Sequence, residues 1–441
     1  MIFTREKIEE LIARANLSEA AAALAVARAE HQEMAAELRD VSAGVYALAG
    51  DDRGLARVIP AALLACRSSA AVAAYYAASG TDPGISAYLS GAVALAWSGD
   101  KAGTYESLNR AHDLALAQGR VHYGVGARER LAHHALLFGD VERARTAVDE
   151  AIALADAHHL SEWLIRCLAA AAHLALDAGD LDRAAKLVER GRAESTDRDT
   201  LALFAPSGAQ LAVELRDDAA LRAWSSQEII DVAHHSQLPA AAIAATIATL
   251  IGGGGVVSAD APAATSLRRA LLLAESAATA AELFTLAARY GNPEEVRLGT
   301  ESLAGVIAPD RAYLKAHYLL ARAYWLMRSG EATGWVDSAG DAARAFNAMG
   351  LRRWTNDAML LLVAQEPVAQ RRQRGRSSGS VLTGREQQVA HLIRRGARNR
   401  EVALALQISE HTVERHVSSI LGRLGLRSRW QIVDPKRVSD N

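Results

Sequence analysis

The sequence predicts an all-α protein that consists of a long helical body and a short helical tail. From Ile8 to about Leu361, apolar residues recur at the spacing of a helix, and alternating β-branched runs are almost absent. Short Gly, Asp and Pro signals interrupt this pattern, as expected between helices. A polar, basic segment then separates the body from a closely spaced set of capping signals. We therefore expect domains at residues 1–366 and 381–441, joined by a linker at residues 367–380.

The body contains a repeated pair of helices with a period of 40 residues. Each repeat is marked by a Gly-Asp pair, and the three pairs are Gly99-Asp100, Gly139-Asp140 and Gly179-Asp180. Gly commonly ends a helix and Asp is a favourable N-cap, so each pair predicts the end of one helix and the start of the next. An Ala seven residues before each Gly, and a Leu or Val nine residues after it, predict where the helices pack inward.

The small and large residues around these turns resemble those of tetratricopeptide repeats, most clearly between Ala92 and Arg192. The period is longer than the about 34 residues of those repeats, which indicates a degenerate, longer variant. The resemblance implies a tetratricopeptide-like (TPR-like) superhelix. Such a superhelix exposes a concave surface that binds peptides, partner proteins or small ligands.

The charge of the chain is distributed unevenly between body and tail. The formal net charge is −2, but from Pro367 onward 15 Lys and Arg stand against 6 Asp and Glu. The first 366 residues carry 34 basic and 45 acidic residues. A basic tail on an acidic body is expected when only the tail meets a polyanion such as nucleic acid.

Composition and local sequence predict a cytoplasmic protein without disulfides, membrane spans or a leader. Cys66 and Cys167 are the two cysteines of the chain, too few for a disulfide framework or a cysteine zinc site. Glu9 and Glu10 stand where a signal peptide needs its apolar core. The uncharged stretch at residues 238–257 is mostly Ala and ends in glycines, so we interpret it as a buried helix followed by a loop. Abundant Arg and Ala with few Lys are typical of a bacterial protein from a GC-rich genome.

The body offers no pattern for catalysis, a metal or a cofactor. Its adjacent histidine pairs are His133-His134, His158-His159 and His234-His235. Neighbouring residues on a helix point about 100° apart and do not share one metal, so we expect polar histidines on helix faces. The glycines at residues 252–255 lack the GK[ST] ending of a phosphate-binding loop. The sequence therefore predicts a protein that is not an enzyme and has no cofactor.

Capping signals divide the tail into four helices. The predicted starts are a capping box of Thr383 and Glu386, an N-cap at Asn399, an N-cap at Ser409 and a box of Ser428 and Gln431. Gly396 and Gly425 are predicted to end the first and third helices, and the second runs to about Leu406. Two short helices joined by a tight turn form the helix-turn-helix arrangement.

The third tail helix has one apolar side and one polar side. Val413, Val417, Ile420 and Leu424 recur at helical spacing and are expected to face inward. Glu414, Arg415 and Ser418 fall on the opposite side, together with the small Gly422. Such a face can enter a DNA major groove, where Arg pairs with guanine and Glu accepts a hydrogen bond from cytosine. His411, Thr412 and the amides of the helix N-terminus are placed for phosphate contacts.

From Val381 to Trp430 the tail resembles the LuxR-type helix-turn-helix domain. The runs that carry the resemblance are LTGRE, NREVA, ISEHTVERHV and LGRLGLRSR. It implies that Glu414, Arg415 and Ser418 occupy base-reading positions, although Glu414 stands where the family often has Lys. The fourth helix, a common dimer contact of the family, is shortened by Asp434-Pro435.

The complete predicted interface with DNA combines the resemblance with the residues on the same surface. Its members are Arg398, Asn399, Arg400, Ser409, His411, Thr412, Glu414, Arg415, His416, Ser418, Ser419 and Arg423. His416 has two alternative roles, because its place between Val413 and Ile420 suits either a phosphate contact or a partly buried structural histidine.

Two functional hypotheses follow from the sequence. The first is a sequence-specific regulator of transcription that binds double-stranded DNA, with a body that senses a small molecule, a peptide or a partner protein. It would act as a homodimer, formed through the repeat body if the shortened tail does not dimerise. The alternative is a protein–protein interaction scaffold that retains a weak or vestigial DNA-binding tail.

Overall fold

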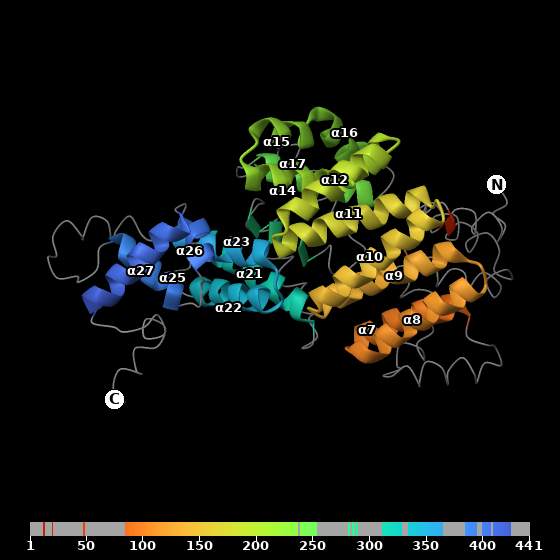
Figure 1. Ribbon diagram of the computed structural model, residues 1–441, viewed down its shortest axis with the longest axis horizontal. Helices are drawn as coiled ribbons and strands as arrows, with labels where there is room; N and C mark the ends of the chain where they lie inside the picture. The colour runs from red at the N-terminus through yellow and green to blue at the C-terminus, as the bar shows by residue number, and fades with distance from the viewer. Residues whose placement is uncertain are drawn as a thin grey trace. The chain divides into compact units, whose positions relative to one another are not determined.

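The computed structural model describes residues 84–236, 239–253, 311–328, 334–364, 384–394, 399–406 and 409–424, with a few positions between 12 and 48 and between 281 and 289. These residues form helices and no strand, which confirms the all-α class (Figure 1). The chain divides into two compact units, Met1–Ala321 and Arg322–Asn441. The linker expected at residues 367–380 lies outside the described residues, and the domain limits drawn from sequence remain a prediction.

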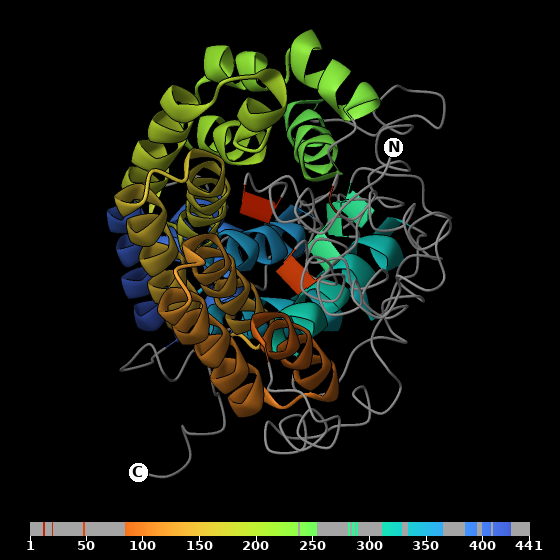
Figure 2. The same ribbon diagram turned by 90° about the vertical axis from the view of Figure 1, so that its right-hand side faces the viewer.

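Six helices form three consecutive hairpins in the first unit. They are α7 (Ile85–Ser98), α8 (Lys101–Ala117), α9 (Val121–Leu137), α10 (Val141–Ala157), α11 (Ser161–Ala178) and α12 (Leu181–Glu194). Each packs mainly against the helix before it and the helix after it. In Figure 2, successive helices from α7 onward follow a curved path, so the stack is bent.

The three Gly-Asp pairs form the turns within these hairpins, as predicted. Their glycines adopt left-handed φ angles of 84°, 76° and 78°. The Asp side chain of each pair accepts a hydrogen bond from the amide three residues later, at 2.9, 3.3 and 3.2 Å. The Asp amide in turn donates to the carbonyl five residues earlier, at 3.0, 2.8 and 2.8 Å. Each pair thus ends one helix and caps the next.

Turns of the same kind also separate the hairpins, halfway between the Gly-Asp pairs. Gly119 takes a φ of 67° between α8 and α9, and His159 takes a φ of 55° between α10 and α11. The His159 amide donates to Asp156 O at 3.2 Å, and the Leu160 amide to Ala155 O at 2.9 Å. The expectation that His158 and His159 lie on a helix face is therefore wrong, because helix α10 ends at Ala157.

Small residues allow the stacked helices to approach closely. Ala92, Ala132 and Ala172, the predicted close-approach positions, are all buried, as are Leu108, Val148 and Val188 after the turns. A Cβ added at Gly126 of α9 would lie 2.9 Å from Trp163 Cη2 of α11. The Trp163 indole nitrogen donates to Ile12 O at 3.1 Å, which ties a segment near the N-terminus to the stack.

Further helices continue the unit beyond α12. They are α13 (Arg198–Ala202), α14 (Ala205–Leu215), α15 (Asp218–Trp224), α16 (Gln227–His235) and α17 (Pro239–Gly253). Helix α17 packs against the other four and buries Ala245 and Ala248 completely. The uncharged stretch is thus a packed helix, while the loop predicted after it lies outside the described residues. None of the helices in the described part of the chain is long and apolar enough to cross a membrane.

The remaining described helices lead to the tail. Helix α21 (Ala312–Arg328) contains the boundary between the two units. In the second unit, α22 (Trp335–Ala348) and α23 (Arg352–Ala364) form a hairpin in which the rings of Phe346 and Trp354 stack at 6.0 Å. The tail helices are α25 (Gly384–Arg394), α26 (Asn399–Leu406) and α27 (Glu410–Leu424), and α23 packs against α26.

Candidate nucleic-acid interface

The three described tail helices form one small core. Helix α27 packs against both α25 and α26. The apolar side chains that fill the space between them are almost completely buried, and they are Val389, Leu392, Ile393, Val402, Leu406, Val413 and Ile420. The predicted fourth helix lies outside the described residues. The first three tail helices predicted from capping signals are confirmed.

Helix α26 is held at its C-terminal end by a contact with α25. Asn399, the predicted N-cap, is the first residue within the helix, and its side chain is half-buried. At the other end, the Arg385 guanidinium of α25 donates a hydrogen bond to the carbonyl oxygen of Leu406. Because the last carbonyls of a helix have no partner within it, this contact fixes the end of α26 immediately before the turn into α27.

Ser409 caps the start of α27. Its Oγ accepts a hydrogen bond from the Thr412 amide at 3.1 Å and lies 2.8 Å from Thr412 Oγ1. The predicted N-cap is therefore confirmed. Ser409 and His411 are exposed and Thr412 is half-exposed. The exposed N-terminus of this helix carries the partial positive charge that favours a phosphate group.

The two sides of α27 differ in burial as predicted for Val413 and Ile420, whereas Val417 is only half-buried. Val413 and Ile420 are 0 % exposed, whereas Glu414, Arg415 and Ser418 are exposed together on the other side. His411 Nδ1 lies 3.7 Å from Glu414 Oε2, within one turn of the helix. The structure thus brings the three predicted base-reading residues onto one accessible surface.

Ser419 and His416 lie at the edge between these two sides. Both are half-buried. The Ser419 hydroxyl donates to Oε1 of Glu386 in α25 at 2.6 Å, and Glu386 is itself only 4 % exposed. This bond gives Ser419 a role inside the domain that sequence reasoning missed, because the partners are 33 residues apart and no short pattern links them. Both roles of His416 remain open.

The other predicted contacts are only partly described. Arg400 and Arg423 belong to α26 and α27, but the placement of their side chains is outside the described part of the chain, and Arg398 is outside it altogether.

Comparison with known proteins places this domain in a family. Residues 380–435 match the family described as bacterial regulatory proteins, luxR family. A segment of 50 residues is 46 % identical to the nitrate/nitrite response regulator protein NarP of Escherichia coli, covering 11 % of this chain and 23 % of NarP.

Longer relatives come from mycobacteria. Over 270 residues the chain is 28 % identical to the protein named "Putative HTH-type transcriptional regulator Rv0890c" of Mycobacterium tuberculosis, covering 60 % of this chain and 30 % of that protein. A Mycobacterium bovis protein, "Putative HTH-type transcriptional regulator Mb0914c", matches with the same identity and coverage. The chain spans less than a third of the length of these relatives. Its C-terminal segment, residues 380–435, is a helix-turn-helix domain of the luxR family of bacterial regulatory proteins.

Proposed function

We propose that this protein regulates transcription by binding a specific sequence of double-stranded DNA through α27. The observation that carries the proposal is the exposed group of Glu414, Arg415 and Ser418 on a helix whose opposite side is anchored by Val413 and Ile420. A helix held in this way presents its free side chains in fixed positions, which direct reading of base edges requires.

Each group on the surface of α27 has a distinct role in the proposal. The Arg415 guanidinium can donate two hydrogen bonds to a guanine, and the Glu414 carboxylate can accept one from the amino group of a cytosine. The helix N-terminus after Ser409, with Thr412 and His411 beside it, receives a phosphate and fixes the register of the helix in the groove. The excess of basic residues after Pro367 supplies attraction to DNA of any sequence.

The helical body completes the proposal as a sensor. It binds a small molecule, a peptide or a partner protein, and it brings two copies of the chain together on a twofold-related DNA site. The mycobacterial relatives match 270 residues of this chain, more than the tail contains, and their names as transcriptional regulators support a regulatory role for the chain. The protein would act in the cytoplasm through binding, without catalysis or a cofactor.

The test of DNA reading is selection of a preferred duplex from a randomised pool by the full chain, followed by footprinting. Arg415→Ala is expected to weaken binding to the selected site by about 1–3 kcal/mol, which is a five- to more than hundredfold loss. It should change binding to unrelated DNA far less. Arg145→Ala, which removes an exposed arginine from α10 of the body, is the matched control and should change neither.

Two results would contradict the proposal. Equal, salt-sensitive binding of the wild-type chain to every duplex would leave only the electrostatic attraction of the tail and favour an interaction scaffold. A footprint that covers one half-site, together with sedimentation of the chain as a monomer, would refute binding as a dimer.

A further inference from the structure

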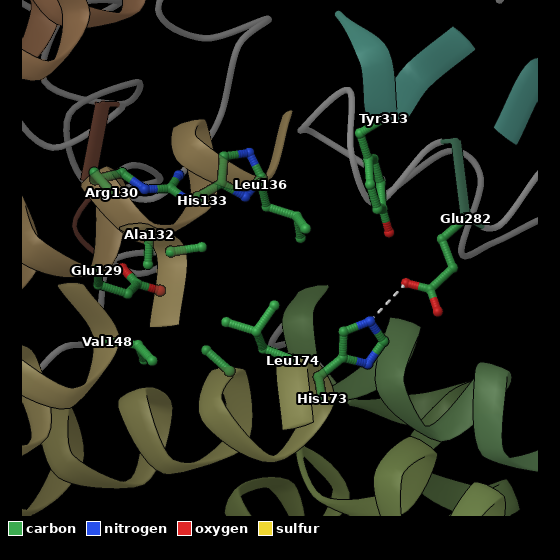
Figure 3. A pocket seen from close by; sticks show the side chains of 12 residues that line it. Glu129, Arg130, Ala132, His133, Leu136, Val148, His173, Leu174, Glu282 and Tyr313 are labelled. Carbon is green, nitrogen blue, oxygen red and sulfur yellow. Dashed lines mark ion pairs between the residues drawn. The ribbon is translucent and has the colours of Figure 1, made fainter. Parts of the chain in front are cut away.

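A pocket opens in the body between three successive helices. Its volume is about 190 Å³, and it is lined by residues of α9, α10 and α11 together with Glu282 and Tyr313 (Figure 3). The middle of the pocket is apolar, formed by Leu136, Val148 and Leu174. Apolar cavities of about 150 Å³ accept benzene, so this pocket suits a ligand that contains one aromatic ring.

One end of the pocket is formed by two neighbouring side chains of α9, Arg130 and His133 (Figure 3). Arg130 is only 7 % exposed. Arg311, 5 % exposed, lies in the same region and donates from Nη2 to Ala96 O at 3.1 Å. Burial, followed by the charges of Arg130, His134 and Arg311, holds the pKa of His133 well below its ordinary value. His133 is therefore neutral, and the positive charge at this end belongs to the arginines.

Behind this end lies His134, a buried histidine with unused hydrogen-bonding capacity. It is 5 % exposed, and neither ring nitrogen has a hydrogen-bond partner among the described residues. It borders a second cavity of about 10 Å³, which Arg130, His133 and Arg311 also line. Burial and the nearby arginine charges lower the pKa of His134 to about 3, so its neutral ring offers one donor and one acceptor here.

The carboxylates around the pocket lie beside an arginine and a histidine. Glu129 pairs with Arg166, Nη2 to Oε1, at 3.0 Å. At the opposite end, His173 Nε2 lies 3.3 Å from Glu282 Oε2 and 3.5 Å from Asp177 Oδ2. Glu129, on the same helix as Arg130, is thus already paired with Arg166, and Glu282 and Asp177 lie at the other end. A negatively charged ligand at Arg130 would therefore not face an unpaired carboxylate there.

We propose that this pocket binds a small organic acid, with its carboxylate against Arg130 and His133 and its apolar body between Leu136, Val148 and Leu174. The inference rests on the proposed function, because it names the class of effector that the sensing body takes. A carboxylate beside a buried guanidinium forms charge-assisted hydrogen bonds, and the apolar middle contributes affinity without regard to charge. Charge at one end and ring-sized volume in the middle together define the ligand.

The experiment titrates the full chain, without DNA, with three probes that share one ring: benzoate, benzyl alcohol and benzylamine. Ligand-observed NMR measures each dissociation constant. Benzoate should bind at least about tenfold more tightly than the other two probes, because a hydrogen bond between charged groups contributes more free energy than one between neutral groups. Arg130→Gln should weaken benzoate about tenfold and leave benzyl alcohol unchanged.

Two further variants separate the pocket from the surface of the protein. Ala170 is an exposed residue that lines the pocket, so Ala170→Trp should close it and abolish benzoate binding without disturbing the core. Arg145→Gln removes an exposed charge from α10 outside the pocket and should change nothing. If Arg130→Gln fails to fold, the charge preference of the wild-type chain and the Ala170→Trp variant decide the question.

The proposal is overturned if benzoate does not bind, if the alcohol or the amine binds equally well or better, or if Ala170→Trp leaves benzoate binding intact. Each of these outcomes concerns the body alone and leaves the DNA-binding proposal standing. Conversely, if the chain gave no DNA footprint but still bound benzoate, the proposed regulatory function would be refuted and the proposed ligand pocket would stand.

Discussion

Replacing Ser419 by Ala distinguishes a structural role of this residue from a contact with DNA. The Ser419 hydroxyl donates to Glu386 across the interface of α27 and α25 at 2.6 Å, and the carboxylate that receives it is 4 % exposed. A hydrogen bond to a charged group contributes about 1.5–3 kcal/mol. Ser419 is half-buried, so water can partly replace its hydroxyl, and we expect a loss of about 1.5 kcal/mol in the variant.

Amide hydrogen exchange of the full chain, followed by mass spectrometry, measures this loss where it occurs. Exchange of the α25 and α27 amides should become about tenfold faster in Ser419→Ala, since about 1.4 kcal/mol corresponds to a tenfold change in the opening equilibrium. Ser418→Ala is the matched control, because Ser418 is the exposed neighbour on the same helix. It should leave exchange unchanged and weaken binding to the selected DNA site.

The reasoning fails if Ser419→Ala leaves the exchange rates of both helices unchanged. A reduction of about one in the salt dependence of DNA binding, with unchanged exchange, would instead identify Ser419 as a phosphate contact.

Four further substitutions test the packing of the body and the protonation of a buried histidine by urea denaturation of the full chain. At Gly191, an added Cβ would lie 2.0 Å from Phe204 Cζ. Overpacking should cost about 3 kcal/mol and the better helix propensity of Ala should return about 1 kcal/mol, so the free energy of unfolding of Gly191→Ala should fall by about 2 kcal/mol. At Gly124, the atom nearest to an added Cβ is a leucine methyl at 3.2 Å, so Gly124→Ala should instead raise the free energy of unfolding by up to about 1 kcal/mol. If both glycine variants changed stability in the same direction, the packing argument would be contradicted. His159→Gly should gain about 0.5–1 kcal/mol by relieving the left-handed conformation, and a lower midpoint would refute this expectation. The pKa of His134 is about 3 in the folded state and about 6.5 in the unfolded state, so the unfolded chain binds a proton first as the pH falls. The stability that the neutral His134 maintains is therefore complete above pH 6.5 and is lost at lower pH. Wild type should lose about 2 kcal/mol more than His134→Gln between pH 7 and pH 5, and equal losses would exclude the histidine as the cause.

The helical hairpins between residues 85 and 194 could be predicted because their signals are local. A left-handed glycine and an Asp cap act within a few residues, so a period in Gly-Asp marks every turn inside a hairpin. The turn at His159 escaped prediction because backbone hydrogen bonds and packing hold it without a glycine.

The surface of α27 was predictable for a similar reason, since helical periodicity alone separates Val413 and Ile420 from Arg415. The pocket was not predictable. It places Glu282 and Tyr313 against helices that precede them by more than a hundred residues, and no spacing in the sequence encodes that contact. The bond between Ser419 and Glu386 belongs to the same class of long-range contacts.

The neighbour-to-neighbour packing of α7 to α12 has a consequence for how the body assembles. Most contacts in this stack join residues close in sequence, so little chain entropy is lost before each contact forms, and rapid folding is expected. Such a stack can nucleate at any hairpin and grow along its length, and its ends open before its centre. Helices α9 to α11, which line the pocket, stand in the interior of this series. They should be the last of the six to open, so a bound acid would reinforce the part of the body that is already slowest to unfold.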